Sequence, residues 1–216
     1  MRSNQVDVSC ALRYSVSSIK QKLRGHLALM SSLRMHTSLN LLFFGRPRAG
    51  NPRKLLHTGA KARWVGDTSA IQRVCNDLNV TYTQLEEIHQ PLRRVLGLLH
   101  SADIVAGPHG AGLTNFIYSA SGAVLIDFMT ADEEWIPLFS RIALANAGSA
   151  IFAKAGGGNS EKGLVIHAQI AERAVRCAVQ IINGFTSCGN GLRWSDGVRV
   201  VSSFQTADVI ATQQKK

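Results

Sequence analysis

Residues 102–119 place a loop with three glycines between an apolar run and a helix-like run. Residues 102–106 have the apolar character of a short strand that stops at a Gly-Pro pair, and residues 113–119 can form two helical turns. The glycines permit tight turns and a close approach of the backbone to a ligand. The amides at the start of the following helix would attract an anion. This segment therefore predicts a strand, a phosphate-binding loop and a helix in succession.

Strand-like and helix-like segments alternate along residues 39–182. Strands are predicted at 39–44, 61–65, 81–83, 102–106, 123–128 and 150–153, and helices at 53–57, 68–78, 91–101, 113–119, 134–147 and 166–182. The central strands are almost wholly apolar, as in sheets covered on both faces. The pattern predicts an α/β fold with a doubly wound, Rossmann-like parallel sheet, in which ligands bind beyond the carboxyl ends of the strands.

The chain divides into three predicted parts. Residues 1–37 have a helical spacing of apolar residues and many basic ones, so we expect a basic helical segment. Residues 38–185 hold the alternating units and are expected to form the Rossmann-like domain, with a flexible polar loop at 155–163. Periodicity fades beyond it, and residues 186–216 are expected to form a poorly ordered tail.

The formal charge of +10 favours anionic partners such as phosphates and nucleotides. The basic residues form no dense tract with interleaved aromatics, so nucleic acid is not the expected partner. No run approaches the roughly 18 apolar residues that cross a bilayer, and no signal peptide is evident at the start of the sequence. We therefore expect no membrane segment in this chain.

Four cysteines, at positions 10, 75, 177 and 188, lack the C-x-x-C and C-x-x-H spacings of zinc and redox motifs. Buried free thiols are the default expectation. An oxidised pair such as Cys177 with Cys188 stays open, because four cysteines allow three pairings. Because the oxidation state of the cysteines is open, the cellular compartment of the protein is open as well.

The run LHSADIVAGPHGAGLTN at 99–115, followed by SGAVLID at 121–127, resembles the signature of glycosyltransferase family 61. FFGR at 43–46 and RKLLH at 53–57 look like the strand-Arg segment and the Arg-Arg-x-x-Asn pattern of that family. The resemblance covers about residues 39–182 and implies the carboxyl-terminal, donor-binding half of a GT-B fold. Family members carry an amino-terminal acceptor domain as well, usually behind a membrane anchor in the Golgi or ER, so we expect this chain to correspond to about half of such an enzyme.

The resemblance implies inverting transfer of a sugar, GlcNAc or a pentose, from a UDP-sugar to a hydroxyl of a protein or polysaccharide. It implies no metal and no cofactor besides the donor substrate, so cationic side chains and helix-start amides must neutralise the leaving diphosphate. Arg46 and Arg53 are the expected cationic clamp. His109 is expected to contact the phosphate or the acceptor, and Asp127, where the family usually has Glu, is expected to meet hydroxyls of the ribose or sugar.

The glycine loop supplies the other expected contacts, from Gly107, Gly110, Ala111, Gly112, Leu113, Thr114 and Asn115. Several of these residues have structural alternatives. His109 could fix the loop by bonding backbone carbonyls, Thr114 could serve only the helix start, and Arg53 could be a solvated charge. Asp103 is expected to be a strand-end or capping carboxylate rather than a base.

Two departures from the family pattern weigh on activity. Residues 119–122 read SASG where the family has a Pro-Pro-Gly approach to the next strand, and His57 replaces an Asn. In a GT-B enzyme the general base commonly comes from the other domain. The alternative function is therefore a catalytically inactive nucleotide-binding fragment that lacks the acceptor domain. A basic RNA-associated protein is a third possibility, which leaves the glycine loop unexplained.

Overall fold

A computed structural model describes residues 38–45, 65–85, 90–130, 138–159, 163–184, 188 and 197–202. Predictions made for residues 1–37, for the helix at 53–57, for the strand at 61–65 except Val65, and for Arg46 and Arg53 lie outside these residues. The elements are β1 (Leu39–Phe44), α4 (Ser69–Asp77), β2 (Val80–Leu85), α5 (Leu92–Ser101), β3 (Ile104–Pro108), η1 (Ala111–Tyr118), β4 (Val124–Met129), α6 (Leu138–Ala145), β5 (Ser149–Lys154), β6 (Gly156–Asn159), β7 (Gly163–Val165), α7 (Ala168–Ile182) and β8 (Val198–Ser202).

Six strands form one sheet in the order β2-β1-β3-β4-β5-β8. The first five are parallel, and their order of 2-1-3-4-5 is that of flavodoxin-like doubly wound sheets. The predicted α/β, doubly wound, Rossmann-like fold is therefore confirmed. The sheet is mixed rather than purely parallel, because β8 pairs antiparallel with β5.

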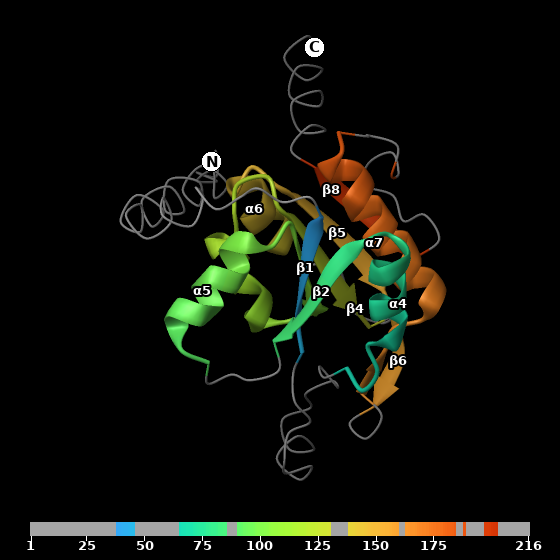
Figure 1. Ribbon diagram of the computed structural model, residues 1–216. Helices are drawn as coiled ribbons and strands as arrows, with labels where there is room; N and C mark the ends of the chain where they lie inside the picture. Colours follow the sequence, from blue (N-terminus) through green and yellow to red (C-terminus); the bar gives the residue numbers. More distant parts are fainter. Residues whose placement is uncertain are drawn as a thin grey trace, which may run out of the picture.

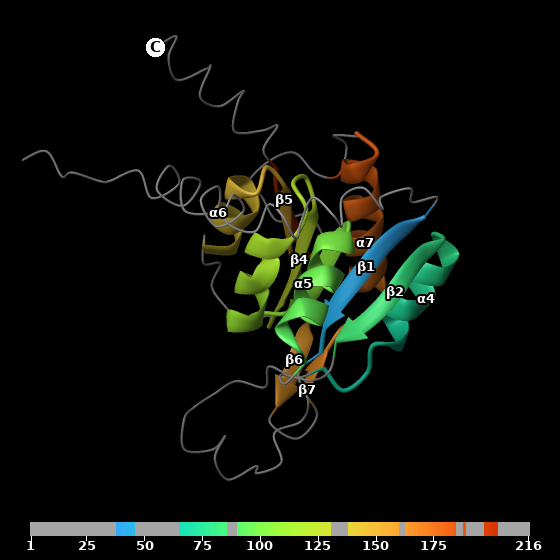
Figure 2. The same cartoon turned by 60° about the vertical axis from the view of Figure 1, so that its left-hand side comes forward.

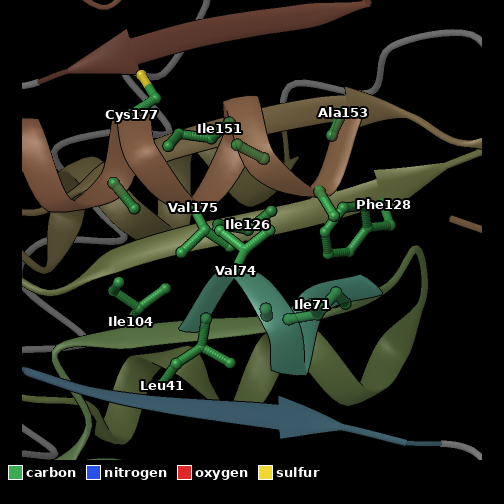
Figure 3. Packing of buried hydrophobic residues seen from close by; sticks show 14 of the residues in the cluster. Leu41, Ile71, Val74, Ile104, Ile126, Phe128, Ile151, Ala153, Val175 and Cys177 are labelled. Carbon is green, nitrogen blue, oxygen red and sulfur yellow. The ribbon is translucent and has the colours of Figure 1, made fainter. Parts of the chain in front are cut away.

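Helices cover both faces of the sheet (Figures 1 and 2). Helices α4 and α7 pack together on one face, whereas α5, η1 and α6 lie on the other. Alternate residues of each strand serve the two layers. Ile104 and Ile126 pack toward α4 and α7 with Val74 and Val175, as Figure 3 shows, while Val105 and its neighbours on the other face contact the second layer. Burial on both faces explains why the central strands have no polar side.

Strand β8 corrects the prediction of a poorly ordered tail at 186–216 for residues 198–202, which extend the sheet; most of the rest of that range lies outside the described residues. Val198 and Val200 pack into the core on the α7 face, and Val201 packs on the opposite face. The run of apolar residues is only a few residues long and stands in a polar stretch, so its periodicity is too brief to identify a strand. Pairing with the open edge of β5 decides its structure.

The prediction of a flexible loop at 155–163 is also wrong at its two ends. Strands β6 and β7 form an antiparallel pair in which Gly156 lies opposite Val165 and Asn159 opposite Gly163. A glycine-rich strand has no alternation of side chains, so sequence periodicity could not reveal it. The hairpin lies at the end of the sheet toward which the arrowheads of β1 and β2 point in Figure 2.

The predicted structural role of Asp103 as a strand-end carboxylate is confirmed at the amino end of β3. Its Oδ2 accepts a hydrogen bond from the backbone amide of Asn40 at 2.9 Å, and its own amide donates to the Asn40 carbonyl at 2.9 Å. These bonds tie the start of β1 to that of β3. Within the described residues, no helix is long and apolar enough to cross a membrane.

Candidate functional site

The candidate site begins where β1 and β3 end side by side. The two strands are neighbours in the sheet, with Leu41 opposite Ile104 and Phe43 opposite Ala106. The connection after β1 leads to β2 on one side, whereas the connection after β3 leads to β4 on the other. This is the topological switch point, where open α/β sheets bind ligands. The segments that follow both strands therefore leave the sheet at one place.

Gly107 is required by the packing of this switch point. It lies inside β3, which continues through Pro108 instead of stopping before the Gly-Pro pair as predicted. A Cβ atom at Gly107 would lie 3.1 Å from both the Cβ and the carbonyl oxygen of Phe44, and 3.2 Å from Cδ2 of Leu113. The absence of a side chain therefore lets β1, β3 and η1 approach one another.

Gly110 makes the turn between the strand and the helix. Its backbone has φ 152° and ψ 179°, a region that only glycine adopts without strain. The following helix, η1, is a 3-10 helix, in which the amide of Leu113 donates to the Gly110 carbonyl at 3.0 Å. Among the described residues, no backbone acceptor takes the amides of Gly110, Ala111 or Gly112. Three backbone amides of the loop are therefore available to bind an anion. The amide of Leu113 is not, because it already donates to the Gly110 carbonyl.

Gly112 has no structural need to be a glycine. A Cβ atom built there meets nothing within 4 Å, and its backbone is not in the left-handed region. The neighbouring Ala111 is exposed. Open space over a glycine at a helix start is where a ligand can approach the backbone most closely.

Thr114 and Asn115 bond back into their own turn. The Thr114 hydroxyl donates to the Ala111 carbonyl at 2.6 Å, and the Asn115 side-chain amide donates to the Gly112 carbonyl at 3.1 Å. Both bonds stabilise the first turn of η1. Their geometry supports the structural alternative for Thr114 and leaves Asn115 with the same local role in this structure.

His109 and Asp127 form a buried pair next to the loop. Asp127 lies on β4 opposite Gly107, and the amide of His109 continues the pairing by donating to the Phe128 carbonyl at 2.9 Å. This arrangement brings His109 Nδ1 to 2.8 Å from Asp127 Oδ2. Asp127 is fully buried and the His109 side chain is 10% exposed. The imidazole is therefore held by a carboxylate.

The pair fixes the hydrogen-bonding state of the imidazole. An ionised carboxylate only accepts hydrogen bonds, so Nδ1 carries the proton when Asp127 is ionised. Nε2 accepts a proton in the neutral ring and donates one in the imidazolium. The Phe139 ring meets the imidazole edge-on, with centroids 5.1 Å apart and planes at 86°. Phe139, on α6, thus packs against the imidazole ring.

The structure brings together nine of the predicted site residues: Gly107, His109, Gly110, Ala111, Gly112, Leu113, Thr114, Asn115 and Asp127. Sequence reasoning missed the pairing of His109 with Asp127 and the contact of Phe139. The pairing could have been predicted from the sequence, because both residues lie near the ends of consecutive predicted strands. No signal in the sequence placed Phe139 at the site.

An open hollow of about 490 Å³ lies elsewhere, between α4 and β2, and its lining carries no charged side chain: Gln72, Asn76, Asn79, Val80, Thr81 and Tyr82. It does not include the glycine loop. Within the described part of the chain, no group of three or more His, Cys, Asp or Glu side chains is arranged to hold a metal ion.

Neither a protein-family model nor a curated protein matches this chain. Among solved structures, the metal-soaked Flv1 flavodiiron core from Synechocystis sp. PCC6803 is similar at a TM-score of 0.40 and 13% identity, over 76% of this chain and 41% of that one. The TT0316 protein from Thermus thermophilus is similar at a TM-score of 0.28 and 16% identity, over 83% of this chain and 65% of that one. This chain spans less than two thirds of either structure.

Proposed function

We propose that this chain is the donor-binding part of a glycosyltransferase similar to family 61. It would bind a UDP-sugar beyond the carboxyl ends of β1 and β3 and transfer the sugar, GlcNAc or a pentose, to a protein or polysaccharide hydroxyl with inversion and without a metal ion. One observation carries the proposal: a histidine held by a carboxylate follows β3 at the switch point of a doubly wound sheet. Next to it is a glycine turn with three backbone amides that donate no hydrogen bond to a described backbone carbonyl.

The diphosphate is proposed to lie over Gly112. The amides of Gly110, Ala111 and Gly112 would donate to its oxygens, and the missing side chain at Gly112 leaves room for a close approach. Oriented amides at a helix start stabilise negative charge without having to reorganise during the reaction. They supply what a metal ion would otherwise supply to the leaving group.

Arg46 and Arg53 are proposed to add the positive charge. Arg46 comes one residue after Gly45, whose amide donates to the Leu85 carbonyl at 3.0 Å at the end of β1. Because β1 is the neighbour of β3, a segment leaving β1 starts at the same edge as the glycine loop. The clamp remains a prediction from the sequence.

His109 is proposed to donate a hydrogen bond from Nε2 to the leaving diphosphate. In the transfer, the acceptor oxygen bonds to the anomeric carbon while the bond from that carbon to the diphosphate breaks. The hydroxyl proton passes to a general base, and negative charge develops on the departing UDP, where the imidazolium stabilises it. Asp127 acts through His109 as a positioning residue, because it is fully buried and bonded to Nδ1.

A nucleotide-binding module without turnover is the second candidate. The loop at 107–115 contains no carboxylate, and Asp127 is buried behind the imidazole. The glycine loop and the pair can thus hold a diphosphate without offering a base to the acceptor hydroxyl. If the base lies in an acceptor domain, this part binds the donor and needs that domain for transfer.

The first test is calorimetric titration of the purified chain with UDP, UDP-GlcNAc and UDP-xylose, with RNA as a control ligand. Wild type is compared with His109→Ala and Arg46→Ala. The matched control is Arg176→Ala, which removes a half-exposed arginine paired with Glu172 on α7. Saturable UDP binding that both site variants lose and the control keeps would support the donor site. A folded wild-type chain that binds no UDP would refute it.

Transfer and donor hydrolysis separate the two candidates once binding is found. Released UDP is measured with each UDP-sugar in the presence and absence of hydroxyl acceptors. Turnover that disappears in His109→Ala supports the transferase. UDP binding without any UDP release supports the module without turnover.

A further inference from the structure

Two of the cysteines meet at the end of α7. Cys177 lies in the second half of this helix and is 4% exposed. Cys188 follows the helix, is half-buried, and packs against the same hydrophobic core on the α7 face of the sheet. Both are thiols in this structure. Nothing in the proposed sugar transfer uses either of them.

Their contacts are reciprocal. The Cys177 thiol donates to the carbonyl of Cys188 at 3.5 Å, and the Cys188 thiol donates to the carbonyl of Cys177 at 3.4 Å. The Cys188 sulfur also lies 2.6 Å from Oε1 of Gln180, one helical turn along α7. Each sulfur is thus directed at the backbone of the other cysteine. Two cysteines whose side chains reach each other's backbone lie near one another, which is the first requirement for a bridge.

We propose that Cys177 and Cys188 are a site of oxidative modification and form a disulfide that ties the chain ahead of β8 to α7. In the reaction each thiol gives up its proton, and one S–S bond forms between the two sulfurs. The two electrons pass to a disulfide oxidant such as oxidised glutathione, which takes up the two protons and leaves as two thiols. The proposal does not depend on the proposed function.

The chemistry of the pair favours a structural bridge over a rapid switch. Burial raises the pKa of Cys177, and burial also raises the pKa of Cys188. Little thiolate is present near neutral pH, so exchange with external thiols is slow in the folded protein. The bridge should therefore form during folding and then resist reduction.

The consequence falls on β8. This strand adds to the edge of β5 and buries Val198 and Val200 against the core, and it follows Cys188 in the chain. A bond from Cys188 to α7 closes a loop between these two residues, which restricts the unfolded chain. In the folded chain it holds Cys188, from which the chain continues to β8, next to α7. Closing a short loop of this kind stabilises the folded state mainly by restricting the unfolded one.

The experiment compares the whole chain refolded in oxidised and in reduced glutathione buffers. Free thiols are alkylated, and peptides are mapped by mass spectrometry without reduction. We expect a linked pair of peptides containing Cys177 and Cys188, with Cys10 and Cys75 alkylated. The oxidised form should melt roughly 5–10 °C higher than the reduced form, as a loop of this size implies.

Variants locate the effect. Cys188→Ser should abolish the difference between the two buffers, and because Cys188 is only half-buried this variant should fold. The double variant Cys10→Ser with Cys75→Ser is the matched control and should keep the difference. Backbone hydrogen exchange of Val198 to Val201 should be slower in the oxidised form.

Three results would overturn the proposal. Wild type refolded in the oxidised buffer could retain both thiols, or it could pair Cys177 or Cys188 with Cys10 or Cys75. A bridge between Cys177 and Cys188 that changes neither the melting temperature nor the exchange of β8 would refute the tie to this strand.

Discussion

Nδ1 of His109 lies 2.8 Å from Oδ2 of Asp127, and the carboxylate is fully buried behind the imidazole. The two residues come from consecutive strands and meet because β3 and β4 pair in register, with Gly107 opposite Asp127. A histidine held in this way keeps one tautomer and one ring orientation. The contact holds the imidazole of a glycine-loop histidine against β4, the strand next to β3.

Asp127→Asn tests whether this contact sets the tautomer of His109. The amide has the shape of the carboxylate but can donate its own N–H to Nδ1, which moves the imidazole proton to Nε2. We expect the ¹⁵N resonances of His109 to report that change. UDP-sugar turnover should fall by roughly 10²-fold or more. His109 resonances and turnover that match wild type would show that Asp127 is not a positioning residue.

Gly107→Ala and Gly112→Ala form a matched pair that separates packing from ligand approach. At Gly107 the new methyl group meets Phe44 at 3.1 Å, so we expect a loss of about 1–3 kcal/mol in the free energy of unfolding. At Gly112 the methyl meets nothing within 4 Å, so stability should stay equal or rise by about 0.4–1 kcal/mol.

The same pair makes a prediction for the ligand. Gly112→Ala should weaken UDP binding although the protein is no less stable, since the methyl group occupies the space proposed for the diphosphate. Denaturant unfolding and calorimetry measure the two quantities on the same samples. Unchanged UDP affinity in Gly112→Ala would place the diphosphate elsewhere.

Gly110→Ala tests the turn itself. With φ at 152° and ψ at 179°, an alanine would be strained by on the order of 1–3 kcal/mol. We expect a lower unfolding free energy together with a displaced His109. Chemical denaturation gives the first, and the His109 resonances give the second. An alanine tolerated without loss of stability would mean that the turn has another conformation.

Asp67→Ala tests a pH-dependent contribution at the start of α4. The backbone amide of Ser69 donates to Asp67 Oδ1 at 2.8 Å and its hydroxyl donates to Oδ2 at 3.0 Å, and these bonds lower the pKa of Asp67, the backbone bond more. A lowered folded-state pKa stabilises the protein above the unfolded pKa, and this stabilisation is lost as the pH falls through the folded value. The side chain is exposed, so the loss in the variant should be at most about 0.5–1 kcal/mol at pH 6.

The pH profile distinguishes this cause from a change in helix propensity. The stability difference between Asp67→Ala and wild type should shrink as the pH falls below about 4, where the carboxylate takes up its proton. Thermal unfolding across pH 3–6 gives the comparison. A difference that stays constant over this range would rule out the ionised carboxylate as its source.

Local patterns in the sequence predicted most of the strands and helices of the described chain. Residues 39–44 and 123–128 were predicted as buried strands and form β1 and β4 within a residue of those bounds. The glycine loop was placed correctly between a strand and a helix, and Asp103 was correctly placed as a strand-end carboxylate. Such patterns did not predict that the helix after the loop is a 3-10 helix.

The elements that were missed share a physical cause. Strand β8 is a few residues of valine and arginine in a polar stretch, and β6 is three glycines and an asparagine. Neither has enough side-chain alternation to favour a strand by itself. Each becomes a strand because a partner offers an open row of backbone hydrogen-bonding groups, β5 for the first and β7 for the second.

The sequence by itself determined the class of the fold and the position of the glycine loop, because apolar runs, helical spacing and glycine act over a few neighbouring residues. Only the tertiary structure decided the strand order β2-β1-β3-β4-β5-β8, the split between Gly107 as a packing residue and Gly112 as an open one, and the bond between His109 and Asp127. These depend on which strands become neighbours and in what register. A strand's own residues define its two faces, whereas its partners are selected by the packing of the whole sheet.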